Sequence, residues 1–216
     1  MKLIIGNKNY SSWSLRPWLL LREHAISFEE IRIALFEQNT YQELAKYTDA
    51  AKVPVLHDGE LAIWDSLAIC EYISETYLKG SGWPVERHIR AEARSISCEM
   101  HSGFYAIREN MPMNVRAVDR AISVSVDMQI EISRIDQIWT TTKAKYSQQG
   151  PWLFGEFSIA DCMFAPMVFR FHTYNIVVSD AARNYMQFVM SNTQLKIWQE
   201  QSLLEMESLP HAELGL

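Results

Sequence analysis

The spacing of apolar residues changes once along the 216-residue chain and divides it into two parts. Up to about residue 78, short apolar runs alternate with amphipathic helical patterns, as in a domain that mixes strands and helices. After residue 86, apolar residues recur every three or four positions, which indicates helices alone. Between them lies the run GSGWPVE, rich in breakers. We therefore predict an α/β domain at 1–79, a linker at 80–86 and an all-helical domain at 87–216.

The first part predicts the order strand, helix, strand, hairpin, helix. Residues 2–6 are typical of a strand buried on both faces, and residues 12–24 of a helix. We expect this helix to start near Ser14, since Pro17 is tolerated best in a first turn. A second strand is expected over 28–36 and a short helix or loop over 38–47. Asp58-Gly59 between apolar runs predicts a β-hairpin, and Asp65-Ser66 predicts the cap of a helix ending near residue 78.

The second part predicts helices throughout. We expect one long helix over 86–110, ended by Pro112, and another over about 116–146, followed by a loop at 147–157. Ser158 and Asp161 have the spacing of a capping box before an apolar helix that runs to about residue 171. We assign this pair to stability. Two further helices are expected over 181–190 and 193–206.

Composition excludes several classes of function. The formal charge is −6 and no basic run appears, so a sequence-independent grip on nucleic acid is not expected. No apolar run approaches the roughly 18 residues of a membrane span, and the N-terminus lacks the pattern of a signal peptide. We therefore expect a cytoplasmic protein without nucleic-acid or membrane partners. The three cysteines are far apart and predict buried free thiols, with neither a disulfide framework nor a metal site: Cys70, Cys98 and Cys162.

Hydroxyl side chains crowd the turn between the first strand and the first helix, at Ser11, Ser12 and Ser14. Such residues can cap the helix. They can also meet an anionic ligand attracted to the helix N-terminus. For Ser14 we favour the cap. For the other two, the local pattern alone leaves both roles open.

Four short stretches carry a resemblance that spans nearly the whole chain: Ser11-Ser12, Val53-Pro54, Asp65-Ser66 and Ser158-x-x-Asp161. In this order and spacing, across an α/β and a helical domain, the chain resembles the cytosolic glutathione S-transferases. It is most similar to the zeta-like bacterial group, in which a cysteine stands at the position of Trp13. The resemblance implies a thioredoxin-like N-terminal domain, a helical-bundle C-terminal domain and a homodimer.

The resemblance also implies that Ser11 activates the thiol of glutathione, with Ser12 as the alternative one residue away. Depressing a thiol pKa of about 8.5 by about two units requires about 2.7 kcal/mol. A helix N-terminus contributes roughly 0.3–1 kcal/mol to an anion, whereas a hydrogen bond to a charged group contributes about 1.5–3 kcal/mol. The hydroxyl donor is therefore the larger contribution.

The other glutathione contacts follow from the same resemblance. Val53, before a cis Pro54, is expected to present its backbone to the cysteinyl part. Asp65 suits the ammonium of the γ-glutamyl group, and Ser66 with the helix N–H groups suits its carboxylate. The candidates for the glycyl carboxylate are weaker: Lys52, Gln38 and Asn39.

A second substrate is expected on the helical domain, near the end of its first helix. Aromatic and methionine side chains there suit a small apolar electrophile, although each could equally belong to an interdomain core. The candidates are Phe104, Arg108 and Met111, with His101, Ser102 and Met113 beside them.

We therefore expect a glutathione S-transferase of the detoxification type, with glutathione as cosubstrate and neither cofactor nor metal. One alternative is a glutathione-dependent cis–trans isomerase of the maleylacetoacetate type, for which Arg170 would have to replace an arginine expected at Thr173. A thiol-redox enzyme is disfavoured by Trp13, which stands where it would need a cysteine. A non-catalytic protein that binds glutathione or another ligand is the remaining alternative.

Overall fold

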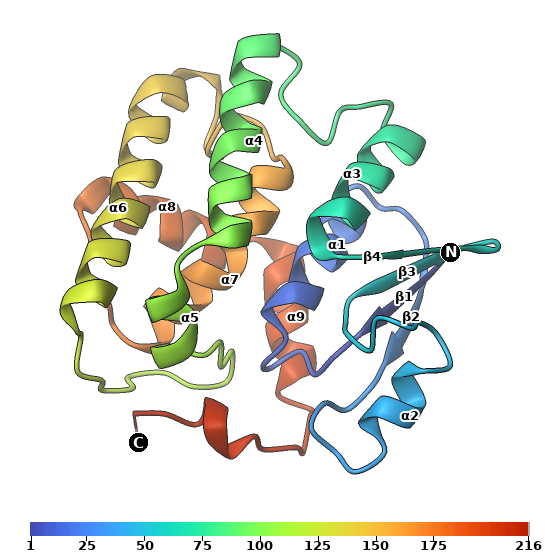
Figure 1. The fold of residues 1–216 in the computed structure, drawn as a ribbon. Helices are drawn as coiled ribbons and strands as arrows, with labels where there is room; N and C mark the ends of the chain where they lie inside the picture. Colours follow the sequence, from blue (N-terminus) through green and yellow to red (C-terminus); the bar gives the residue numbers. More distant parts are fainter. Residues whose placement is uncertain (216) are drawn as a thin grey trace.

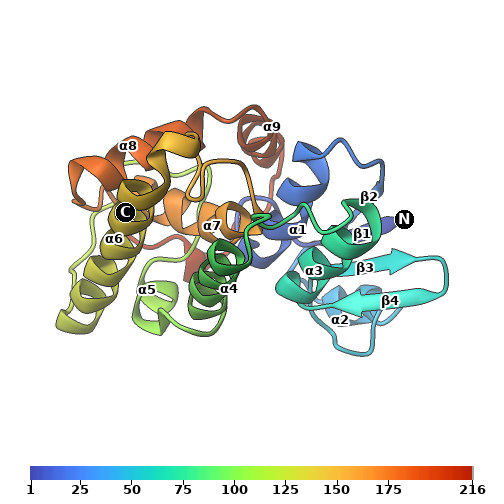
Figure 2. The ribbon, with the colours of Figure 1, turned by 90° about the horizontal axis from the view of Figure 1, so that it is seen from above.

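The computed structural model describes residues 1–215 and shows an α/β part beside a helical part (Figures 1 and 2). The predicted fold class is confirmed. The α/β part contains β1 (Lys2–Ile5), α1 (Ser12–Glu23), β2 (Glu29–Arg32), α2 (Thr40–Leu44), β3 (Val55–Asp58), β4 (Leu61–Trp64) and α3 (Ser66–Tyr77). The helical part contains α4 (Arg87–Ser102), α5 (Tyr105–Asn110), α6 (Val126–Tyr146), α7 (Ile159–Thr173), α8 (Asp180–Ser191) and α9 (Thr193–Ser202). Short 3₁₀ turns lie at Ser147–Gln149 and Pro210–Ala212.

The sheet has the strand order β2-β1-β3-β4, with β1 parallel to β2 and antiparallel to β3. Helices α1 and α3 cover one face and α2 the other (Figure 1). The continuous apolar run of β1 serves both faces, as predicted. Leu3 and Ile5 join the large core on the side of α1, whereas Ile4 packs with Ile33, Leu44 and Val55 in a smaller core.

Helix α7 is the centre of the helical part and packs against α1, α4 and α8. Its only exposed residue is His172. The predicted capping box at its start is confirmed: the Asp161 carboxylate accepts the backbone N–H and the hydroxyl of Ser158, at 3.0 and 3.1 Å. Because α7 is buried against α1, the two domains share one apolar core.

The expected single helix over 86–110 is wrong. It breaks at Gly103 and Phe104, where Phe104 adopts a left-handed backbone with φ of 62°. One nearby side chain and one distant side chain satisfy the broken ends. Arg108 donates to the Gly103 carbonyl at 2.9 Å, and the Glu131 carboxylate accepts the backbone N–H of Ile107 at 2.8 Å. Tertiary hydrogen bonds therefore override the local helical pattern.

The expected start of the next helix at residue 116 is also wrong. Helix α6 begins at Val126, where the Ser125 hydroxyl accepts the Met128 N–H at 3.2 Å. Residues 116–125 instead run beside α7, and the Arg120 N–H donates to the carbonyl of Thr173 at 2.9 Å. In this stretch Ala117 is buried and Ile122 packs against the core, whereas Val118 and Val124 are 54% and 43% exposed, so the apolar spacing does not mark the buried face of a helix.

Smaller differences between prediction and structure concern the ends of helices and strands and the exposure of one cysteine. Helix α1 begins at Ser12 rather than near Ser14, so Pro17 lies inside the helix and removes one main-chain hydrogen bond. Strand β2 is shorter than expected. Helix α9 ends at Ser202, and the segment after it runs below α5 in the view of Figure 1. Cys70 and Cys162 are buried free thiols as predicted, but Cys98 is exposed. No helix within residues 1–215 is long and apolar enough to cross a membrane.

Candidate functional site

A cavity of about 630 Å³ lies where the start of α1 faces the helical part. The turn before α1 contributes Tyr10, Ser11, Ser12 and Trp13 to its wall. Opposite walls come from the segments around α2 and before β3, from α5 and α7, and from the C-terminal segment. The main residues of these walls are Lys52, Val53, Arg108, Met113, Arg170, Leu209 and His211.

Ser11 is the N-cap of α1. Its side-chain oxygen accepts the Ser14 N–H at 3.4 Å and lies 2.7 Å from the Ser14 hydroxyl. The Ser14 oxygen in turn accepts the N–H of Gly6, at the end of β1, at 3.1 Å. If Ser14 donates its proton to Ser11, the Ser11 proton is free to donate to a ligand in the cavity. Such a chain of donors strengthens its last member.

Ser12 is held from the helical part. Its oxygen accepts a hydrogen bond from Nη2 of Arg170 on α7 at 3.3 Å. Arg170 is 5% exposed, and its other terminal nitrogen donates to the Met111 carbonyl. Burial, followed by the charge of Arg108, lowers the pKa of Arg170 to about 9. The guanidinium therefore carries a positive charge at neutral pH and polarises the Ser12 hydroxyl.

Trp13 lies at the centre of a cationic cluster. Its ring packs against the guanidinium groups of Arg16 and Arg108, at 4.3 and 4.9 Å from the centroid. Arg16 is 1% exposed, and burial lowers its pKa to about 9. Within residues 1–215, Arg16, Arg108 and Arg170 form no ion pair with a carboxylate at 4.0 Å or less. This concentration of unpaired positive charge favours an anion beside the serine turn.

The predicted backbone contact at Val53 is placed suitably. The Val53–Pro54 peptide bond is cis, and Val53 lines the cavity together with Lys52. Gln38 is exposed, and neither it nor Asn39 belongs to the wall.

Asp65 and Ser66 begin α3 beside this cavity, not in its wall. The Asp65 carboxylate caps the helix by accepting the Leu67 and Ala68 N–H groups at 2.8 and 3.2 Å. Its second oxygen lies 2.9 Å from Nε2 of His101 on α4. The Ser66 hydroxyl accepts from Arg16 at 3.2 Å. Trp13 and Arg16 therefore connect this pair to the serine turn.

The residues predicted for an electrophile separate in the structure. Arg108 lines the cavity, as does Met113. Phe104 and Met111 are buried in the core, at 6% and 0% exposure, because the helix break turns their side chains inward. The sequence-based prediction named His101 for this region, but His101 instead contacts Asp65 and the edge of Trp13.

The sequence-based prediction gave too little weight to one polar residue, Arg170, and missed another, Glu205. Arg170 directly follows the long apolar run of α7, in the last turn of the helix, and that isolation of a charge was a usable signal. Glu205 accepts two backbone N–H groups of the loop before Ser11. It lies in the segment after α9, where no local pattern marks it. No cluster of three potential metal ligands exists among the described residues.

Comparison with protein families assigns both parts of the chain. Residues 10–76 match the model of the glutathione S-transferase N-terminal domain. Residues 109–187 match the model of the C-terminal domain of the same family.

Individual relatives are distant and have diverse names. A stringent starvation protein A homologue of Haemophilus ducreyi is 22% identical over 92% of this chain and 86% of the relative. A probable maleylacetoacetate isomerase of Caenorhabditis elegans is 36% identical, over 43% of this chain and 42% of the relative.

Solved structures share the whole fold. A glutathione transferase homologue from Burkholderia with bound glutathione matches with a TM-score of 0.69 at 20% identity, covering 94% of this chain and 97% of the other. A zeta-class maleyl pyruvate isomerase matches with a TM-score of 0.71 at 17% identity, over 97% and 100% of the two chains. Because both domain models match in order on this two-part fold, the chain belongs to the glutathione S-transferase family.

Proposed function

We propose that the protein is a glutathione transferase that binds reduced glutathione in the 630 Å³ cavity and stabilises its thiolate with the Ser11 hydroxyl. The observation that carries this proposal is the position of Ser11. It caps α1 at the cavity wall, and its oxygen lies within hydrogen-bond distance of two donors, the Ser14 N–H and hydroxyl. Its own proton is then left for the sulfur.

Three sources of positive potential meet at the proposed sulfur position. The N-terminus of α1 contributes roughly 0.3–1 kcal/mol to an anion. The Ser11 hydroxyl contributes about 1.5–3 kcal/mol as a donor to a charged acceptor. Arg170 adds its charge through Ser12. Together these are sufficient for the roughly two-unit depression of the pKa that makes a thiol a nucleophile at neutral pH.

In this proposal, the other parts of glutathione bind the residues that the sequence analysis named for them. Backbone groups of Val53 hold the cysteinyl part. Asp65 pairs with the γ-glutamyl ammonium and Ser66 binds its carboxylate, while Lys52 and Gln38 are the candidates for the glycyl end. Glutathione is a cosubstrate, and the chemistry requires neither a metal nor a covalent enzyme intermediate.

The experiment that tests this proposal is a titration of bound glutathione, followed by thiolate absorbance. In the wild-type protein we expect the pKa of the bound thiol to fall about two units below the free value of about 8.5. Ser11→Ala should raise it again by at least about one unit, and Ser12→Ala by less, because Ser12 acts beside the sulfur contact. A thiol pKa that is unchanged in Ser11→Ala would refute the assignment.

A second variant separates the hydroxyl from the helix cap. Ser11→Gly also removes the hydroxyl, but glycine costs an N-cap only a few tenths of a kcal/mol, compared with about 1 kcal/mol for alanine. Both variants should therefore raise the thiol pKa equally, although their stabilities differ. Thermal unfolding measured in parallel shows which effect each substitution has.

A second candidate function is favoured by the charge of the cavity. Within residues 1–215, Arg108 and Arg170 line it without a carboxylate partner at 4.0 Å or less, so a substrate with its own carboxylate would be bound well. That is the requirement of a cis–trans isomerase acting on an unsaturated keto acid. There the thiolate adds to the double bond, the resulting single bond rotates and the thiolate leaves, so that glutathione is regenerated.

An assay panel separates the candidates. Conjugation of neutral electrophiles supports the transferase, and turnover of maleylacetoacetate without loss of glutathione supports the isomerase. Binding of glutathione with no turnover of any compound supports a ligand-binding protein. We further propose a cytoplasmic homodimer acting in detoxification, on the basis of family membership.

A further inference from the structure

The loop between β1 and Ser11 is buried to an unusual degree for a loop. Asn7, Lys8 and Asn9 are 0%, 3% and 0% exposed. Buried backbone N–H groups require partners, and a loop has no neighbouring strand or helical turn to supply them. The partners of this loop therefore decide its shape.

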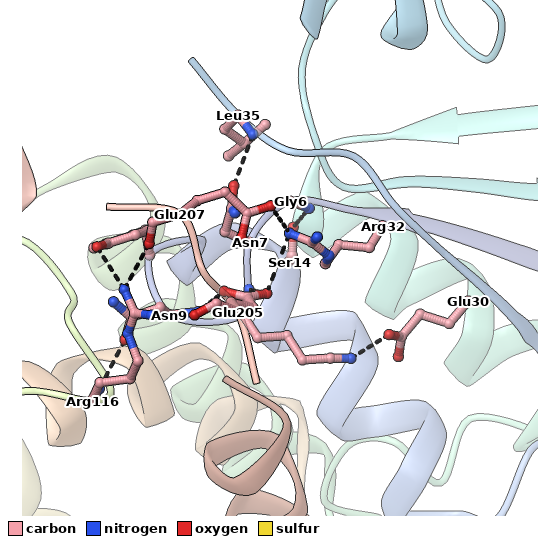
Figure 3. A network of polar contacts seen from close by, with 12 residues as sticks. Gly6, Asn7, Asn9, Ser14, Glu30, Arg32, Leu35, Arg116, Glu205 and Glu207 are labelled. Atoms are coloured by element: carbon pink, nitrogen blue, oxygen red, sulfur yellow. Dashed lines mark hydrogen bonds and ion pairs between the residues drawn. The ribbon is translucent and has the colours of Figure 1, made fainter. Parts of the chain in front are cut away.

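Glu205 supplies two of these partners from nearly 200 residues away in the sequence. One carboxylate oxygen accepts the Lys8 N–H at 2.6 Å, and the other accepts the Asn9 N–H at 3.0 Å. Figure 3 shows the carboxylate aimed at the loop from the C-terminal segment. The Glu205 side chain is 5% exposed. A charge is buried to this extent only where strong hydrogen bonds compensate for lost hydration.

Glu205 is itself held on several sides. Arg116 donates to the Glu205 carbonyl at 2.6 Å, and its backbone N–H donates to the Asn9 side chain at 2.8 Å. Trp198 on α9 donates to the Lys8 carbonyl at 2.9 Å. Arg32 on β2 lies 3.8 Å from the Glu205 carboxylate. The segment after α9 is thus fastened to both domains at this point.

The position of Ser11 depends directly on the position of this loop. The Asn7 carbonyl accepts the N–H groups of Tyr10 and Ser11, at 3.2 and 2.8 Å. Residues 7–11 therefore form one turn, and Glu205 binds the two residues in its middle. A shift of this turn would move the Ser11 hydroxyl relative to any sulfur in the cavity. Because donor–acceptor distance decides the strength of such a bond, small shifts matter.

We propose that Glu205 is a positioning residue for the thiolate: its carboxylate holds the turn 7–11 so that Ser11 donates in the correct direction. This inference rests on the proposed function. It assigns to the C-terminal segment a part in the chemistry, although its carboxylate does not line the cavity.

The chain contains a matched control two residues away. Glu207 is also partly buried, with a side chain 19% exposed, and it also pairs with Arg32, at 2.8 Å. Its carboxylate contacts Arg32 and accepts no N–H from the turn 7–11 among the hydrogen bonds of residues 1–215. Glu205→Gln and Glu207→Gln therefore make the same chemical change on the same segment, and only the first places an amide N–H₂ against a backbone donor of the turn.

The test combines two measurements on the full-length protein. Hydrogen exchange of residues 7–12, followed by mass spectrometry without glutathione, reports whether the turn is held. Thiolate absorbance of bound glutathione reports whether Ser11 is aligned. In Glu205→Gln we expect exchange of the turn to accelerate at least about tenfold and the thiol pKa to rise by about one unit. The thiolate fraction below that pKa then falls about tenfold.

A merely structural role would give a different pattern. At a pH below the wild-type thiol pKa, where bound glutathione is a thiol in both proteins, we expect the dissociation constant of glutathione in Glu205→Gln to change less than about threefold, because Asp65, Ser66 and Val53 are untouched. The turnover defect should disappear at a pH above the raised thiol pKa. Glu207→Gln should match the wild type in exchange of the turn and in thiol pKa.

Two results would overturn the inference: unchanged exchange of the turn in Glu205→Gln, or faster exchange with an unchanged thiol pKa. If Glu205→Gln does not fold, Glu205→Asp provides the second variant, since its shorter carboxylate remains an acceptor but cannot reach both N–H groups. The same two results would count against the inference there. A wild-type protein whose bound thiol has a normal pKa would refute the proposed function itself, and the inference with it, before any variant is measured.

Discussion

At the scale of single residues, the important feature of the site is which serine hydroxyl protons remain free to bind a ligand. Ser11 and Ser12 differ by one position, yet their oxygens meet different partners, Ser14 within α1 and Arg170 on α7. The sequence alone could propose both hydroxyls but could not rank them by geometry. The structure supplies each with a donor on its oxygen and therefore with a proton that can point into the cavity.

Asp65 allows a sharp test of glutathione recognition. Asn tolerates the positive φ of 75° at this position and can still cap α3 through its side-chain oxygen. Asp65→Asn should therefore leave thermal stability nearly unchanged. It removes the charge that we propose pairs with the γ-glutamyl ammonium, so the dissociation constant of glutathione, measured by calorimetry, should rise at least about tenfold.

A modified ligand controls for indirect effects of this substitution. A glutathione analogue without the γ-glutamyl amino group should bind Asp65→Asn and wild type equally. If the variant loses the same affinity for both ligands, Asp65 acts through the shape of α3 or through His101, which lies 2.9 Å from it, and not through the ammonium.

At the scale of elements, α7 links stability to the site. Its N-terminus is fixed by Asp161, which accepts hydrogen bonds from Ser158, from the Leu153 N–H at 3.1 Å and from the Tyr185 hydroxyl at 3.0 Å. Its other end carries Arg170 to Ser12. The first end stabilises the fold and the second end holds Ser12. Substitutions at the two ends should therefore have different effects.

Asp161→Ala should lower the free energy of unfolding by about 3 kcal/mol, because several buried donors lose their acceptor together. Asp161 lies nine residues before Arg170, roughly 13 Å along the helix. The thiol pKa of bound glutathione should therefore not change in the variant that still folds. Denaturant unfolding and the thiolate titration measure the two quantities. A raised thiol pKa would show that the cap also orders the site.

The break between α4 and α5 shows where prediction of elements fails. The pattern through residue 110 is helical, but the chain turns at Phe104 because Arg108 and Glu131 satisfy the backbone groups that the break exposes. Glu131 lies on α6, so its contribution is invisible in the local sequence. The break also moves Phe104 and Met111 from the expected substrate site into the core.

At the scale of the whole molecule, the cavity depends on several separate parts of the chain. The turn before α1, helix α7 and the C-terminal segment each contribute part of its wall. The Tyr10 hydroxyl donates to Glu213 at 2.6 Å, which ties the end of the chain to the start of α1. The wall is therefore complete only when residues 209–212 have packed beside the start of α1, where the Leu209 N–H donates to the Tyr10 hydroxyl at 3.3 Å.

The quaternary state is the prediction that belongs to this scale. By family membership we expect a homodimer, in which the first domain of one subunit faces the helical domain of the other. Large apolar side chains on β4 and α3, Trp64 and Tyr77, are 59% and 40% exposed in the single chain. Sedimentation should give twice the 25.1 kDa mass of one chain. A species of 25.1 kDa at micromolar concentration would contradict the expectation.

Strong local signals in the sequence were enough to predict several elements. An apolar run specifies β1, an Asp-Gly turn specifies the hairpin, and capping residues specify the starts of α3 and α7, because each signal acts within a few residues. These elements were enough to indicate the fold, the family and the serine turn.

How the turn is held, and which charges surround it, depends on contacts that form only in the folded chain. Arg170 reaches Ser12 from 158 residues away, and Glu205 reaches the loop before Ser11 from 196 and 197 residues away. Such contacts arise from packing of the two domains, and no local pattern encodes them. The serine turn that the sequence marks as a cap thus acquires its proposed chemistry from residues that only the fold brings to it.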